Sequence, residues 1–159
     1  MLAIAYNWWK LLHIVGVLGF VMFHGVSAWV ALRLRTERDR VRIAELLQFS
    51  GSVVRGMYVS LGLLILFGVV AGFAGHYWSR WWIWAAIVIL VGMVGEMSAV
   101  AGPYYRGVKE AVEIRPSGVP RRSDEELDEI LRSPLALFNT VLGFVSLAVL
   151  AYLMVFKPS

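Results

Sequence analysis

Two histidines and one glutamate lie inside stretches of apolar sequence that are long enough to cross a lipid bilayer. His13 and His24 belong to the first stretch, and Glu96 belongs to the third. An ionisable side chain inside hydrocarbon costs several kcal/mol unless it is paired or bound to a ligand. Imidazole and carboxylate groups at such depth are suited to holding a cofactor or moving protons. These three residues are therefore the first candidates for a functional site.

The composition of the chain is that of a membrane protein. Of its 159 residues, 59% are hydrophobic and only 16% are charged, and the mean hydropathy is +0.70. A membrane span needs about 20 mostly apolar residues, and four windows meet this length: residues 8–32, 53–75, 81–101 and 134–156. We therefore expect an all-α integral membrane four-helix bundle that forms a single domain over residues 1–159.

The distribution of basic residues predicts the orientation in the membrane. Only three of the 15 Lys and Arg residues, Lys10, Arg80 and Lys157, fall outside the two connections 33–52 and 102–133 and their flanks. Basic residues are retained on the cytoplasmic side. We therefore expect both connections in the cytoplasm, both termini outside, and a multi-pass protein of the bacterial plasma (inner) membrane. The net charge of +4 is then a topology signal and does not indicate nucleic-acid binding.

The two cytoplasmic connections contain predicted helices. Residues 36–50 mix apolar and charged side chains, which is typical of a helix that runs along the inner surface or extends the second span. The sequence Ser-Asp-Glu-Glu at 123–126 predicts a capping box that begins a short helix ending near Pro134. Pro103, Pro116, Gly118 and Pro120 make the remainder of the second connection a predicted solvated linker.

A helical rise of about 1.5 Å per residue places five polar residues in one layer of the cytoplasmic half. They are His24, Arg55, Tyr58, Glu96 and Asn139. Arg55 is the predicted counter-charge of Glu96. The layer predicts either a functional polar cluster or a set of hydrogen bonds that only hold the helices together.

His13 belongs to an outer layer, close to the level of His76. Eleven residues separate His13 from His24, so both face nearly the same side of the helix. Gly16 and Phe20 lie between them, and a small residue together with an aromatic one would let a flat macrocycle approach and be covered. The stripe therefore suits haem held by a proximal histidine, with His76 or His24 as further metal-ligand candidates. The alternative is a histidine that is hydrogen-bonded within the bundle or exposed at the headgroups.

Several short runs resemble one superfamily of small four-helix membrane proteins. These runs are WKLLHIVGV at 9–17, RGMY at 55–58, Gly68, LFN at 137–139 and the closing residues 157–158. They are similar to sequences of the superfamily that groups HemJ-type protoporphyrinogen oxidases, the CopD copper-resistance domain and an uncharacterised integral-membrane branch. The resemblance implies a four-helix bundle with b-type haem bound through His13.

Two departures separate the chain from the HemJ type. Its fourth span has Asn-Thr-Val-Leu at 139–142, where HemJ-type sequences have Asn-Glu-Val-Pro, and its third span has no lysine among residues 81–84. Porphyrinogen oxidation is therefore not expected. Haem binding is expected because the ligand His13 is retained, and the uncharacterised branch is the closer resemblance.

Three functions remain open from the sequence. The first is a haem b redox or electron-transfer protein, a membrane oxidoreductase with His13 as axial ligand and His76 or a methionine as second ligand. The second is a CopD-like copper-handling module. The third is a non-catalytic accessory or assembly subunit, in a homo-oligomer or a larger membrane complex. The soft ligands available for Cu(I) are His13, His24, Met57, Met93 and Met97.

Overall fold

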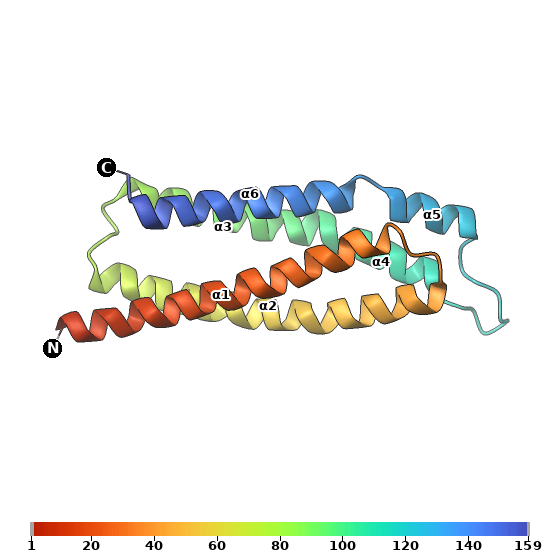
Figure 1. The fold of residues 1–159 in the computed structure, drawn as a ribbon, viewed down its shortest axis with the longest axis horizontal. Helices are drawn as coiled ribbons and strands as arrows, with labels where there is room; N and C mark the ends of the chain where they lie inside the picture. The colour runs from red at the N-terminus through yellow and green to blue at the C-terminus, as the bar shows by residue number, and fades with distance from the viewer. Residues whose placement is uncertain (1, 159) are drawn as a thin grey trace.

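The chain forms four long helical columns that run along one axis (Figure 1). The computed structural model describes residues 2–158 and, for side chains, residues 6–158. Four helices are long and apolar enough to cross a membrane, so the predicted all-α architecture is confirmed. The helices in chain order are α1 (Leu2–Leu34), α2 (Arg40–Ala74), α3 (Trp81–Glu96), the π-helical turn η1 (Met97–Ala101), α4 (Gly102–Val112), α5 (Asp124–Arg132) and α6 (Leu135–Phe156).

The two ends of the bundle carry different connections (Figure 1). Both ends of the chain lie beside the α2–α3 turn, and we call this the outer end. The α1–α2 loop and the α4–α5 connection lie at the opposite end, which we call the inner end. This arrangement is the one expected for an even number of spans.

Two of the helices extend beyond their predicted limits at the inner end. Residues 36–50 are mostly part of α2, which begins at Arg40 after the N-cap Asp39, so this segment extends the second span. The third column continues through η1 and α4 to Val112 instead of ending at residue 101. Pro103 does not break it, because it lies in the first turn of α4, where a missing backbone N–H has little cost.

The short helix α5 begins at the predicted capping box. Ser123 Oγ accepts a hydrogen bond from Glu126 N at 3.2 Å, and Ser123 N donates to Glu126 Oε2 at 3.0 Å. Leu127 and Leu131 on its apolar face are buried in a cluster with residues of α1, α2 and α4. The inner end is therefore a packed helical assembly.

The membrane-spanning surface is different in character. In the most apolar window of the third and fourth spans only 11% of the residues are buried. Large apolar side chains such as Leu18, Leu66, Val88 and Val145 are exposed on the outside of the bundle. Apolar side chains of this number on a surface are stable in lipid, which is consistent with a multi-pass membrane protein.

The most extensive helix contact in the bundle is between α1 and α2. A Cβ atom at Gly16 would come within 2.7 Å of the backbone nitrogen of Leu64. Glycine here lets the two backbones approach, as small residues do between membrane helices. Gly16 is therefore used in the α1–α2 contact.

Candidate functional site

His13 is held by two features of α2. Its Nδ1 lies 2.8 Å from the carbonyl oxygen of Leu64. A carbonyl oxygen only accepts hydrogen bonds, so Nδ1 carries the proton and the lone pair is on Nε2. A Cβ atom at Gly68 would come within 2.9 Å of the imidazole ring. The contact with α2 therefore fixes both the tautomer and the position of the ring.

A group of tyrosines and lysines lies beyond His13 at the outer end. The Tyr6 and Tyr77 hydroxyls are 3.2 Å apart, and Lys157 Nζ donates to the Tyr77 hydroxyl at 3.2 Å. Lys10 Nζ lies 5.5 Å from the centre of the Tyr6 ring. The hydrogen bonds from Tyr6 and then Lys157 lower the pKa of the Tyr77 hydroxyl. The sequence has no acidic residue at positions 1–36, 46–95 or 130–159, so this outer cluster is cationic.

His24 is enclosed between α1 and α6. Only 5% of its surface is exposed, and no hydrogen-bond partner reaches Nδ1 or Nε2 within the described part of the chain. Its ring stacks on Phe20 with centroids 6.2 Å apart and meets the edge of Phe144 at 5.7 Å. A Cβ atom at Gly143 would overlap Nε2. His24 is thus a buried polar group whose hydrogen-bonding capacity is unused.

A cavity of about 550 Å³, which we call the inner cavity, opens beside His24. Of the predicted polar layer, His24, Tyr58 and Asn139 line this cavity. When its side-chain amide is oriented to donate, Asn139 donates to Glu96 Oε1 and, at 3.3 Å, to the carbonyl oxygen of Leu135. Four members of the layer are therefore brought together.

Arg55 is the member that the structure does not bring to Glu96. Its side chain is exposed, and the ion pairs found among residues 6–158 do not include one between Arg55 and Glu96. The neighbour of Glu96 is the amide of Asn139. The expected counter-charge is thus replaced by a neutral hydrogen-bond donor.

The other predicted cofactor residues are used in different ways. His76 is an exposed residue of the outer turn with a positive φ of 54°. His13 packs against Gly68, which precedes His76 by eight residues, or about 12 Å of helix, so the two histidines are not brought together. Phe20 is 1% exposed and packs in a core cluster with Met57 and Met93.

Some features of the two sites have no counterpart among the sequence predictions. Of the residues in the outer cluster, the sequence predictions include only Lys10 and Lys157, as basic residues of the outer side. Tyr104, Arg106 and Lys109 line the inner cavity, although their segment reads as a linker because of Pro103. The two adjacent tyrosines at 104 and 105, followed by a basic residue, are the signal that identifies a membrane-boundary helix instead.

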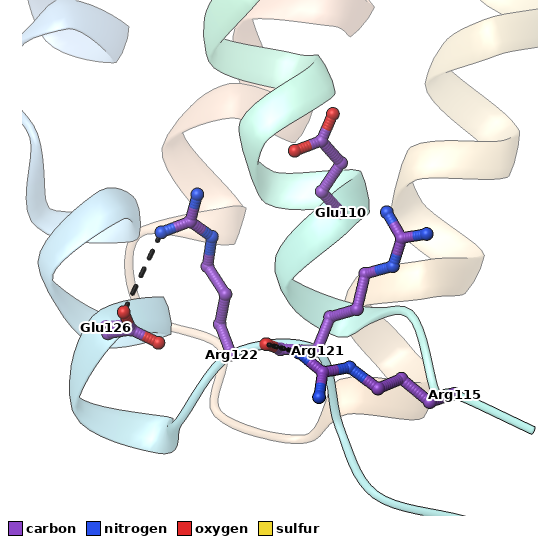
Figure 2. A pocket seen from close by; sticks show the side chains of 5 residues that line it. All are labelled: Glu110, Arg115, Arg121, Arg122 and Glu126. Atoms are coloured by element: carbon purple, nitrogen blue, oxygen red, sulfur yellow. Dashed lines mark hydrogen bonds and ion pairs between the residues drawn. The ribbon is translucent and has the colours of Figure 1, made fainter. Parts of the chain in front are cut away.

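A second hollow, of about 470 Å³, lies on the surface of the inner end (Figure 2). Arg122 forms an ion pair with Glu126 at 3.8 Å, and Arg115 donates to the carbonyl oxygen of Arg121 at 3.3 Å. Each of the three arginines that line it is partnered by a carboxylate or a carbonyl oxygen within residues 113–126. This group holds the loop between α4 and α5 in place. Its lining residues are Glu110, Arg115, Arg121, Arg122 and Glu126.

Comparison of the chain with protein-family models, with curated proteins and with solved structures found no match.

Proposed function

We propose that the protein is a haem b-binding protein of the bacterial plasma membrane with a redox or electron-transfer role, and that His13 is the axial ligand. The observation that carries the proposal is the hydrogen bond from His13 Nδ1 to the Leu64 carbonyl at 2.8 Å. Metal-ligating histidines almost always donate their other ring N–H to a carbonyl or carboxylate. This bond holds Nε2 as the free ligand atom.

The surroundings of His13 fit this role. Gly68 leaves space for the ring against α2, and the ring stays at the position that the Leu64 hydrogen bond defines. Lys10, one helical turn from His13, and Lys157 in the outer cluster would supply cations for the two carboxylates of haem b. The rings of Trp9 and Phe67, which adjoin Lys10 and Gly68 in the sequence, stack with centroids 6.0 Å apart and would provide aromatic cover.

Haem would supply one-electron redox chemistry, and its axial ligand and hydrogen bonding tune the potential. The protein groups contribute in a defined way: Leu64 increases the basicity of the His13 imidazole and sets its orientation. The resemblance of residues 9–17 to the HemJ and CopD superfamily implies the same ligand.

The test is a reduced-minus-oxidised absorbance spectrum of the detergent-purified protein from haem-replete cells. We expect a Soret band with sharp α and β bands, and we expect His13→Ala to remove them. His76→Ala is the matched control, because His76 is exposed in the outer turn, and it should leave the spectrum unchanged. A colourless wild-type protein would contradict the proposal and favour an accessory or assembly role.

Copper handling is the second candidate, because one set of soft donors does converge. His24, Met57 and Met97 line the same cavity, and thioether and imidazole groups suit Cu(I). His13 cannot share this ion, since eleven residues of helix place it about 16 Å from His24. Titration with Cu(I) against a chromophoric chelator tests the site: Met57→Leu with Met97→Leu should abolish binding, and His13→Ala should not.

A further inference from the structure

The inner cavity is elongated along the bundle. On the third column its lining extends from Met97 to Lys109, which is twelve residues, or about 18 Å of helix. His24 lies toward the membrane interior, and Arg106 and Lys109 lie toward the inner end. All four columns contribute to the walls. The cavity therefore has one buried end and one end at the membrane boundary.

The walls of the inner cavity contain hydrogen-bonding groups without partners. Within the described residues, five buried side-chain N or O atoms make no hydrogen bond, and three of these belong to His24 and Tyr104. Both residues line the cavity. A buried polar atom left unpaired is costly to the folded state. A bound molecule with a polar atom at this level would remove that cost.

The other end of the cavity is positively charged. Arg106 and Lys109 line it, and neither takes part in the ion pairs found among residues 6–158. Among residues 6–158, no acidic side chain lines the cavity. Two unpaired cations at a cytoplasmic membrane boundary attract anionic groups, and arginine binds carboxylates and phosphates through charge-assisted hydrogen bonds.

Small apolar side chains make up part of the wall between the two ends of the cavity. Ala28, Ala31, Ala101 and Ala136 line it, and the π-helical turn η1 lies beside it. Single π-turns inside helices frequently occur at functional sites. The volume of about 550 Å³ falls within the range of about 300–1,000 Å³ typical of small-molecule sites.

We propose that the inner cavity binds a small amphiphilic acid. Its carboxylate or phosphate lies at Arg106 and Lys109, its apolar body lies between the spans, and a polar atom further along it hydrogen-bonds to His24. This site is separate from His13 and does not depend on the haem proposal.

Electron paramagnetic resonance with 12-doxyl-stearate tests the site on the full-length protein in detergent. This probe has a carboxylate at one end and a nitroxide oxygen, a hydrogen-bond acceptor, along its chain. We expect one saturable, motionally restricted population. The methyl ester of the probe, which has no charge, should bind about tenfold more weakly or worse.

Two substitutions at glycines of α2 separate loss of the site from loss of folding. Gly51 lines the cavity, and a Cβ atom there would meet nothing within 4 Å. Gly51→Leu should therefore add a bulky side chain at the wall of the cavity without disturbing the helix and should abolish the saturable population. Gly62 is equally open and does not line the cavity, so Gly62→Leu should bind the probe as the wild type does.

Two further changes test the two ends. Arg106→Gln with Lys109→Gln should lower affinity for the acid about tenfold or more and leave the methyl ester unaffected, whereas the loop substitution Arg115→Gln should change neither. His24→Phe keeps an aromatic ring and removes the donor, so affinity should fall about fivefold. Equal binding of acid and ester, or binding unchanged in Gly51→Leu, would overturn the proposal.

A second arm identifies the source of the acid. Spin-labelled phosphatidylglycerol is compared with spin-labelled phosphatidylcholine, which has no net charge. Selectivity for phosphatidylglycerol that Arg106→Gln with Lys109→Gln removes would assign the site to a bilayer phospholipid. Selectivity confined to the stearate would assign it to a free amphiphilic acid, and either result supports the site.

Discussion

His13 and His24 lie on the same helix but differ in the hydrogen bonding of their imidazole rings. His13 donates to the Leu64 carbonyl, so one ring nitrogen is satisfied and the other is defined as an acceptor. His24 has no partner on either nitrogen within the described residues. The first arrangement suits a permanent ligand, and the second suits a site that a molecule enters and leaves.

At the same scale, the partner of Glu96 can be tested by double-mutant cycles. Asn139 donates to Glu96, so unfolding measurements in detergent should give a coupling of about 0.5–1.5 kcal/mol between Glu96→Ala and Asn139→Ala. The cycle of Glu96→Ala with Arg55→Ala should be additive to within about 0.5 kcal/mol. A larger coupling of Glu96 to Arg55 than to Asn139 would contradict this hydrogen bond and support the ion pair that the sequence predicts.

The depth of polar residues could be predicted from sequence, but their direction could not. A fixed helical rise correctly places Tyr58 and Asn139 at the level of His24, where all three line one cavity. Arg55 is at a suitable depth but is exposed on the outside of the bundle. Its direction could not be predicted, because the rise along a helix does not define how α2 is rotated against α3. The hydrogen bond between His13 and the Leu64 carbonyl could not be predicted from sequence either, since it depends on where α1 and α2 cross.

Among the elements, the crossing of α1 and α2 positions His13. Gly16→Ala would push a methyl group into the Leu64 backbone, where the Cβ distance to nitrogen is 2.7 Å, and overpacking of this kind costs about 1–3 kcal/mol. Gly25 lies on the same helix with nothing within 4 Å of its Cβ position. Gly25→Ala should leave stability unchanged or raise it by up to about 1 kcal/mol. Equal thermal stabilities of the two variants in detergent would argue against this crossing.

The loop between α1 and α2 depends on the charge of Glu37. Its carboxylate accepts hydrogen bonds from the backbone N–H groups of Arg38 and Asp39, which lower its pKa below the ordinary 4.5. A lowered pKa stabilises the folded state above the ordinary value, and this contribution disappears as the pH falls through the lowered pKa.

Glu37→Gln, which resembles the protonated side chain, should therefore be less stable than the wild type at pH 7. The two proteins should converge as the pH falls below 4.5. Glu45→Gln, on an exposed face of α2, is the control for removal of a charge. A difference in unfolding midpoint that stays constant down to the lowest accessible pH would contradict the role of Glu37.

The missed helix α4 illustrates a limit of reading elements from sequence. Pro103 and the adjacent charges indicate a linker, yet η1 and α4 continue the third column. A proline in the first turn after a π-helical segment is compatible with a helix. Tyr104, Val108 and Ala111 are buried in the same apolar cluster of the inner end as Leu127 and Leu131. The spacing of these three residues, four and then three apart, is helical, but it indicates a helix only if Pro103 is not taken as a helix end.

In the whole molecule, the two candidate sites lie in opposite halves of one bundle. The outer half contains His13 beneath a cationic cluster, and the inner half contains a cavity with an unpaired histidine and two unpaired cations. About 16 Å of α1 separates the two histidines. This separation lets each site be altered without touching the other.

The orientation that the basic residues predict can be tested directly, because the chain contains no cysteine. Ser79 lies in the outer turn and Ser117 in the inner connection, and both are exposed. In intact cells a membrane-impermeant maleimide should label the Ser79→Cys variant but not the Ser117→Cys variant, and both should react after permeabilisation. The reverse labelling pattern would show that the predicted orientation is wrong.

The most direct test of His13 as the haem ligand is rescue of its deletion by imidazole. The reduced-minus-oxidised spectrum of His13→Gly should lack the α and β bands, and millimolar imidazole added to the haem-reconstituted protein should restore them, because the small ligand can occupy the position of the missing ring. His76→Gly should need no imidazole. A His13→Gly protein that retains the wild-type spectrum without imidazole would show that another residue holds the iron.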